Sequence, residues 1–357
     1  MRPDFHEKPF DEGTLAKLEL FQLYAREWLP VFLSRAEPVW PDVHIFDFFA
    51  GPGQDVAGTA GSPVRIVQEA IDCRHKLIEG KVHLHFHFSD ADEAKTRALE
   101  SCLRPLVDRL PHATLDVQAI PFEESFQRAL PILHRSDTAN LVLIDPCGVN
   151  HVDDEVFRQL ISAPTTDFLL FVASSFLHRF SEHPAMRLRI KKSDSFYHCH
   201  RAVVELYRTF IPANDHYYLA PFSIKKEGSQ LYGLIFGTSH LLGMDKFLNT
   251  AWTKDTLNGE ANFDINQEDF QDHAPFLCLD IFDKPTKLRA FAADLREQIL
   301  TGKCANELEV VEVCFQHGVK RQHAEEVLRQ LKTEGRIKID FRVPQIAHKP
   351  PRLIELQ

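Results

Sequence analysis

Short apolar runs alternate with helical stretches along the first half of the chain, and this alternation limits the fold more than any other feature of the sequence. The predicted strands cover residues 44–50, 82–89, 114–121, 141–145 and 168–173, and the predicted helices between them cover 62–75, 91–109, 123–133 and 153–162. Such alternation builds right-handed βαβ units and a mostly parallel sheet with helices on both faces. We therefore predict an α/β protein with a Rossmann-like core, whose ligands bind at the carboxyl ends of the strands.

The core is expected to span residues 41–254 and to follow an N-terminal helical extension, residues 1–40, whose helix at 14–34 covers one sheet face. Two late apolar runs, 217–224 and 230–237, are separated by Lys-Lys-Glu-Gly-Ser. That spacing predicts a hairpin. The sheet is therefore expected to end with an antiparallel strand at its edge.

The last third of the chain has a different character. Residues 255–285 are polar and acidic and are interpreted as a linker. Helices are predicted at about 286–300, 306–316 and 320–334, with Gly318 between the second and third, and a short strand at 336–341. This order is typical of a helix-turn-helix with a trailing strand. We predict a winged-helix-like module at 286–345 and a C-terminal tail at 346–357.

Composition restricts the class of protein further. The formal net charge of −10 argues against a surface that binds nucleic acid all over, but permits a local basic patch. The seven cysteines lie singly, without a CxxC pair, which favours reduced thiols over disulfides or a metal site. The N-terminus lacks an apolar signal region, and no run reaches the length of a membrane span. We expect a cytoplasmic protein with no membrane segment and no metal.

The strongest local feature is the segment Ile-Phe-Asp-Phe-Phe-Ala-Gly-Pro-Gly at residues 45–53. A buried strand runs here into a turn where Gly51 and Gly53 let the backbone approach a ligand without Cβ interference. Asp47 lies within apolar surroundings and needs hydrogen bonds there. Val56 replaces the third glycine of the dinucleotide fingerprint. We predict that Asp47, Ala50, Gly51 and Gly53 bind a cofactor.

An acidic residue at the end of the second strand is where a Rossmann-like site holds ribose hydroxyls. Asp90 is the first candidate and Asp92 the second, and the alternative is that Asp90 caps the following helix. The histidines at 83, 85 and 87 alternate along one strand face, and a partly solvated polar face is favoured over a metal cluster.

The fourth strand ends in Asp145-Pro146-Cys147-Gly148. In adenine and cytosine amino-methyltransferases a tetrad at this place holds the exocyclic amine and stacks on the base, but only Asp145 and Pro146 match it. Cys147 also invites comparison with the thiolate nucleophile of cytosine-C5 methyltransferases. A small buried cysteine is the alternative. We carry Asp145, Pro146 and Cys147 forward as candidate catalytic residues.

Together the 45–53 segment, Gly61-Ser62-Pro63 and Ile144-Asp145-Pro146-Cys147-Gly148 resemble the three-Cys-motif partner family over about residues 5–250. The resemblance implies a class I methyltransferase fold, S-adenosylmethionine as cofactor, and a radical-type partner protein with a three-cysteine motif. Members usually carry Phe where this chain has Cys147. Ser62 is expected to cap the helix that begins with Pro63, and whether that helix N-terminus meets a cofactor carboxylate is left open.

Two functions follow from these observations. The first is an S-adenosylmethionine-dependent methyltransferase that acts on nucleic acid or a nucleobase, with Asp145 orienting or deprotonating the acceptor. The second is a non-catalytic accessory module that docks the partner protein. The C-terminal module adds a mildly basic face for nucleic acid or protein, made of Lys320, Arg321, Gln322, Arg329, Lys332, Arg336 and Lys338.

Overall fold

A computed structural model describes residues 8–34, 37–79, 81–146, 154–173, 199–212, 215–225, 231–263, 286–347 and 349–357. The chain divides into an N-terminal unit, Met1–Gly243, and a C-terminal unit, Met244–Gln357. Among the helices described, none combines the length and apolar character needed to cross a membrane.

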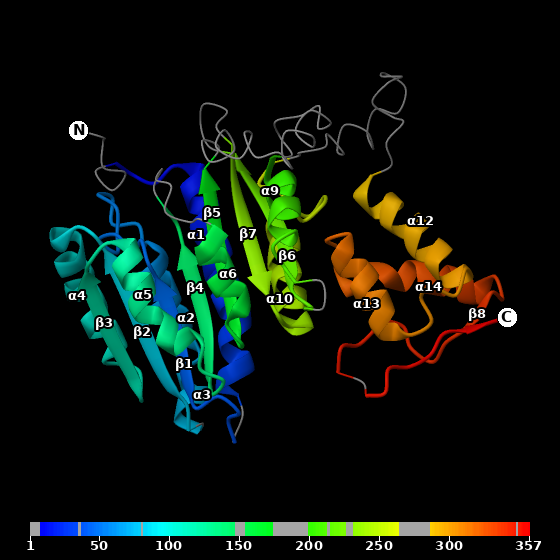
Figure 1. The fold of residues 1–357 in the computed structure, drawn as a ribbon, viewed down its shortest axis with the longest axis horizontal. Helices are drawn as coiled ribbons and strands as arrows, with labels where there is room; N and C mark the ends of the chain where they lie inside the picture. Colours follow the sequence, from blue (N-terminus) through cyan, green and yellow to red (C-terminus); the bar gives the residue numbers. More distant parts are fainter. Residues whose placement is uncertain are drawn as a thin grey trace. The chain divides into compact units, whose positions relative to one another are not determined.

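A seven-stranded sheet forms the centre of the N-terminal unit, in the order β3-β2-β1-β4-β5-β7-β6 (Figure 1). The strands are β1 (Asp42–Asp47), β2 (His83–Asp90), β3 (Ala113–Ala119), β4 (Thr138–Ile144), β5 (Thr166–Ala173), β6 (Tyr218–Lys225) and β7 (Leu231–Thr238). The first five run parallel, as predicted. The predicted pairing of the last two is confirmed, but the expected edge position of the antiparallel strand is wrong. β7 lies between β5 and β6 and is antiparallel to both.

Helices cover both faces of this sheet (Figure 1). One layer contains α5 (Phe122–Leu133), α6 (Asp154–Ser162) and α9 (Cys199–Arg208), and the other contains α1 (Glu12–Leu33), α2 (Ser62–Asp72), α3 (Arg74–Glu79) and α4 (Glu93–Val107). Alternate residues of the strands face the first layer, where Phe46 and Phe168 pack in one buried cluster with Phe126 and Phe157. The mostly parallel sheet with two helical layers is consistent with the predicted Rossmann-like α/β core.

The helix α1, predicted as a separate extension, belongs to the same unit as the sheet. Asp11 caps it by accepting a bond from the Thr14 amide at 2.6 Å. Its Tyr24 hydroxyl donates to the Asp167 carboxylate, at the start of β5, at 2.6 Å. Burial raises the pKa of Asp167 to about 6, opposed by bonds that include those from Thr238 and Tyr24. This contact ties the first helix to the middle of the sheet.

The C-terminal unit begins inside α10 (Leu241–Lys254), a helix that the sequence analysis did not predict. The unit boundary therefore lies before the expected residue 254. Asp255 follows the helix and accepts bonds from four amides at 3.0–3.3 Å, those of residues 257, 258, 260 and 261. Asn258 and Glu260 are buried. The first part of the predicted linker is thus an ordered turn, and residues 264–285 lie outside the described residues.

The predicted helices of the C-terminal module are present as α12 (Lys287–Leu300), α13 (Glu307–Gln316) and α14 (Ala324–Thr333), the last preceded by a 3-10 turn, η4 (Arg321–His323). The predicted strand is reduced to β8 (Ile337–Lys338), which pairs with β9 (Glu355–Leu356). The expected tail thus folds back: Arg352 donates through its backbone amide and its guanidinium to the buried Glu307. Despite burial, these bonds and one from Gln345 lower the pKa of Glu307 to about 2.

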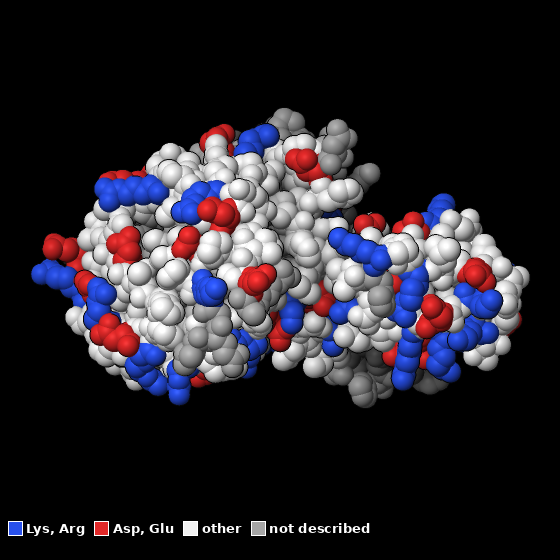
Figure 2. All heavy atoms as spheres, turned by 90° about the horizontal axis from the view of Figure 1, so that it is seen from below, with Lys and Arg blue, Asp and Glu red and all other residues white. Residues whose placement is uncertain are grey.

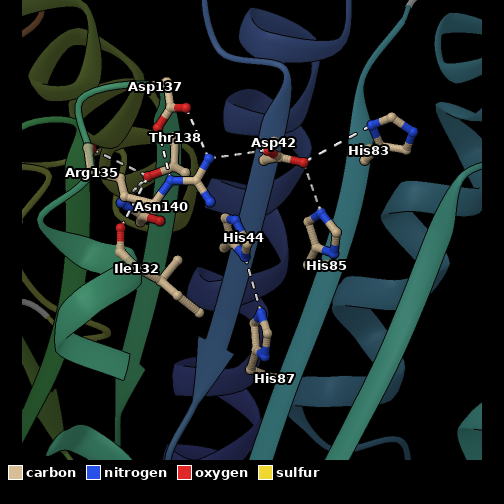
Figure 3. A network of polar contacts seen from close by, with 10 residues as sticks. All are labelled: Asp42, His44, His83, His85, His87, Ile132, Arg135, Asp137, Thr138 and Asn140. Atoms are coloured by element: carbon tan, nitrogen blue, oxygen red, sulfur yellow. Dashed lines mark hydrogen bonds and ion pairs between the residues drawn. The ribbon is translucent and has the colours of Figure 1, made fainter. Parts of the chain in front are cut away.

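A row of histidines crosses β1 and β2 on the face that α5 covers in part (Figure 3). His44 lies 3.0 Å from His87 between ring nitrogens, and the His85 ring stacks on His44 with 4.5 Å between centroids. Asp42 contacts His85 at 3.1 Å and Arg135 at 3.5 Å. The polar, partly solvated face expected for the strand of residues 83–87 is confirmed, because the His83 side chain is 56% exposed and those of His85 and His87 are 22% exposed.

His44 is the buried member of this row. Burial lowers its pKa to about 3, and the neighbouring histidines His85 and His87 and Arg135 add to the effect while Asp42 opposes it. The folded protein therefore holds His44 neutral, whereas the unfolded chain binds a proton near the ordinary pKa of about 6.5. The full contribution of His44 to stability is present above that pH and is lost as the pH falls toward 3.

Replacing this side chain should therefore reduce the acid sensitivity of the fold. We expect His44→Phe, which keeps an aromatic ring beside Phe46, to flatten the dependence of the unfolding free energy on pH between 6 and 4 by up to about 1.4 kcal/mol per pH unit. Urea denaturation at stepped pH measures the slope. The exposed His83→Phe is the control and should keep the wild-type slope; equal slopes in all three proteins would contradict the assignment.

Candidate functional site

Three carboxylates meet at the carboxyl edge of the sheet, where the strand order reverses. Asp47 ends β1 and pairs in register with Phe88 of β2 on one side and Leu143 of β4 on the other. Asp90 and Asp145 each lie two residues beyond those partners. β1 is followed in sequence by β2 on one side and β4 by β5 on the other, and such a reversal is the usual ligand position in open α/β sheets.

Asp47 is held by its neighbours at this reversal. It is 1% exposed and accepts bonds from the Phe49 amide at 3.1 Å and the Ser62 hydroxyl at 2.6 Å. Burial raises the pKa of Asp47 to about 6, while these two bonds oppose the rise. Ser62 was expected to cap α2, but the cap position is Gly61 and the Ser62 hydroxyl serves Asp47 instead.

The glycine loop is fastened to β2 and to the start of α2. The Ala50 amide donates to the Ser89 carbonyl at 3.0 Å, and the Gly51 amide donates to the Asp90 carboxylate at 3.1 Å. Gly51 and Gly53 have φ angles of 63° and 89°, a region that favours glycine. The Gly61 amide donates to the Gly53 carbonyl at 2.8 Å. The N-terminus of α2 therefore lies beside the loop, and Ala50 and Gly51 position the loop through bonds inside the protein.

The two acidic candidates after β2 have different roles. Asp92 is the N-cap of α4, accepting from the amides of Ala94 at 2.8 Å and Lys95 at 3.3 Å. Asp90 accepts from the amides of Gly51 and Asp92 and stays partly exposed at the sheet edge. A carboxylate has about four acceptor positions. The structure thus makes Asp92 the capping residue and leaves Asp90 as the ligand-facing candidate.

Asp145 forms an ion pair that the sequence analysis missed. Its partner is Lys17 of α1, whose side chain is only 7% exposed, against 16% for Asp145. Lys17 also lies 4.8 Å from the centroid of the Phe171 ring. One signal for it was available, because Lys17 falls at helical spacing with the buried Phe21, Tyr24 and Trp28. Pro146 is buried beside Asp145, and Cys147 lies outside the described residues.

Aromatic side chains flank this row of carboxylates on both sides. Phe171, near the end of β5, stacks on Tyr232, near the start of β7, with 5.1 Å between ring centroids. Phe49, after β1, stacks on Phe122, at the start of α5, at 5.2 Å. Aromatic residues at this edge were not predicted from the sequence. The fold supplies them from other strands, which pairing alone brings to the same edge.

The residues 8–33 also help to build the loop. Asp55 accepts from the amides of Phe10 at 2.8 Å and Thr59 at 2.8 Å. Although burial opposes the change, these backbone donors lower the pKa of Asp55. The N-terminal segment is thus bonded to the glycine loop as well as to Asp145.

The described side chains at the carboxyl edge of the sheet include charged groups of both signs. It offers a partly exposed carboxylate at Asp90, a desolvated carboxylate at Asp47, and an ion pair between the buried Lys17 and the partly buried Asp145. No group of three His, Cys, Asp or Glu side chains in the described part of the chain is arranged to hold a metal ion. Comparison with models of protein families found no match, and a search of curated proteins found none either.

Proposed function

We propose that the chain is an S-adenosylmethionine-dependent methyltransferase of the class I type, as its resemblance to the three-Cys-motif partner family implies. The observation that carries the proposal is the position of β7, inserted antiparallel between β5 and β6 after a parallel β3-β2-β1-β4-β5 arrangement. Class I methyltransferases share this strand order, whereas a six-strand dinucleotide-binding sheet is wholly parallel.

The residues at the reversal fit this cofactor. A Cβ on Gly53 would lie 3.0 Å from a Leu99 methyl, and one on Gly61 would lie 3.2 Å from the Gly53 carbonyl, so a side chain at either position would have to displace its neighbour. Asp90 would accept from the ribose hydroxyls, as acidic residues after the second strand do in Rossmann-like sites. The buried Asp47 suits the cationic amino group. The cofactor would supply a methyl group on a positively charged sulfur.

On the β4 side, Asp145 is the candidate that holds or removes an acceptor proton. Methyl transfer from a sulfonium needs in-line positioning and loss of one proton, so few catalytic groups suffice. The proposed acceptor is nucleic acid or a nucleobase. The partly exposed Tyr232, which stacks on the buried Phe171, supports a planar acceptor, because every nucleobase has a face that can stack on an aromatic ring.

Binding of the cofactor tests this proposal directly. Calorimetry should detect S-adenosylmethionine binding to the wild type and a loss of at least about tenfold in affinity, about 1.4 kcal/mol, in Asp90→Ala. The control is Asp92→Ala, two residues away, which should keep the affinity and lose about 1 kcal/mol of stability with its helix cap. If the wild type binds no S-adenosylmethionine, the methyltransferase proposal is wrong.

The affinity should also depend on pH through Asp47. Its raised pKa means that part of the population is protonated near pH 6, and a cationic ligand favours the ionised form. Affinity is therefore expected to rise with pH, by up to about tenfold per unit below pH 6, and to level off above it. Asp47→Asn should flatten this profile. Asp167→Asn is a matched control, because Asp167 also has a pKa near 6 but lies at the other end of the sheet.

A second function, docking of a protein partner, is favoured for the C-terminal module. Several of its predicted basic residues already have partners: Arg321 bonds Asp245 at 2.7 Å and is partly buried, Arg329 bonds Glu326 at 2.6 Å, and Lys338 lies 3.4 Å from Glu355. On the face that Figure 2 shows, basic and acidic side chains are interspersed in both units. Phosphate binding needs unneutralised positive charge. We therefore propose that this winged-helix-like module contacts a protein, with the radical-type three-Cys-motif protein as candidate.

Fluorescence anisotropy with duplex DNA tests whether this module binds DNA or docks a protein. We expect the module to contribute no affinity for DNA, so that Arg336→Gln with Lys338→Gln, two exposed residues of its predicted basic face, should leave the dissociation constant of the whole chain within about twofold of the wild type. Glu326→Gln with Glu334→Gln, which unpairs Arg329 and Arg296, should tighten binding and steepen its salt dependence. A loss of DNA affinity of more than about tenfold in Arg336→Gln with Lys338→Gln would contradict protein docking by this module.

A further inference from the structure

Lys17, a charged residue that the structure describes at the carboxyl edge of the sheet, has no role yet in the proposed function. It comes from α1, outside the alternating strands and helices, and its side chain is almost fully buried against Asp145. Burial of a charge is costly unless it is paired, and a hydrophobic pair at the same place would anchor α1 as well. A buried lysine beside the reversal of the strand order therefore points to recognition of a charged group.

The order of charges across the strands suggests which group that is. Asp90 follows β2, Asp47 ends β1, and the Lys17–Asp145 pair lies after β4, so that the three positions span two strand spacings, about 10 Å. Lys17 and Asp145 both act electrostatically on Asp47, Lys17 lowering and Asp145 raising its pKa. The carboxylate of Asp47 and the ammonium group of Lys17 therefore lie near each other, on the side of Asp47 away from Asp90, the residue proposed for the ribose.

We infer that Lys17 binds the α-carboxylate of the amino-acid end of S-adenosylmethionine, while Asp47 faces its α-amino group. This inference rests on the proposed function and assigns one further binding residue to it. A lysine ammonium is a compact point charge with three donors, and it binds more than one carboxylate at a time. The pair with Asp145 then links the end of the cofactor to the acceptor side of the site.

The alternative role of Lys17 is purely structural, holding α1 on the sheet through Asp145. Replacing Lys17 would lower the affinity for S-adenosylmethionine in either role, so loss of affinity alone does not distinguish them. A ligand that lacks only the carboxylate does. Decarboxylated S-adenosylmethionine keeps the adenosine, the sulfonium and the amino group, and 5′-methylthioadenosine lacks the whole amino-acid end.

Calorimetry with these three ligands tests the inference. The wild type should bind S-adenosylmethionine at least tenfold more tightly than its decarboxylated form. Lys17→Met should reduce this preference to less than twofold and leave the affinity for 5′-methylthioadenosine within twofold of the wild type. Lys17→Arg should keep the preference in large part. Because Lys17→Met leaves Asp145 buried without its cation, the double variant Lys17→Met with Asp145→Asn provides a folded comparison and should also show no preference.

The outcomes separate this inference from the proposed function. If the wild type binds S-adenosylmethionine but the preference for the carboxylate persists in both lysine-free variants, the assignment of Lys17 is overturned and the cofactor proposal stands. If the wild type binds none of the three ligands, both are overturned.

Discussion

The pairing of β1 with β2 on one side and β4 on the other is the constraint on which the rest of the N-terminal unit depends. It places Asp47 at the point where the strand order reverses and carries Asp90 and Asp145 to either side of it. Every other group of the candidate site is positioned relative to this strand. Ser62 and the Phe49 amide hold Asp47, and the Gly51 amide reaches Asp90.

The local pattern of apolar residues was sufficient to predict the strands of this sheet. All seven predicted strands are present, because buried parallel strands are read from short apolar runs bounded by turn residues. Their order was only partly accessible. The hairpin of β6 and β7 follows from spacing, but which of the two pairs with β5 depends on packing between distant segments. Composition misled at residues 255–261, where polar side chains are buried because one carboxylate, Asp255, satisfies four backbone amides.

The candidate site shows the same limit. Asp47, the glycines and Asp90 were found because each lies beside a recognisable strand end. The different roles of Asp90 and Asp92 were not predicted, because both residues follow the strand. Only the geometry at the N-terminus of α4 shows that Asp92 is the cap. Lys17 lies far from the site in sequence and reaches it through helix packing, as do Phe171 and Tyr232 through strand pairing. Residues that the fold brings together from distant segments give only a weak signal in the sequence, such as the single charged residue Lys17 on the apolar face of α1.

The two contacts of α1 with the sheet also have a consequence for how the chain folds. Lys17 and Asp145 are separated by 128 residues, and Tyr24 and Asp167 by 143. The first helix therefore leaves the ribosome long before either carboxylate exists, with Tyr24 and other residues destined for burial still exposed to water. Contacts of such large separation slow folding, because the loop must close before they contribute. The helix made first is secured only after β5, so synthesis of the N-terminal unit yields no finished site until most of that unit is complete.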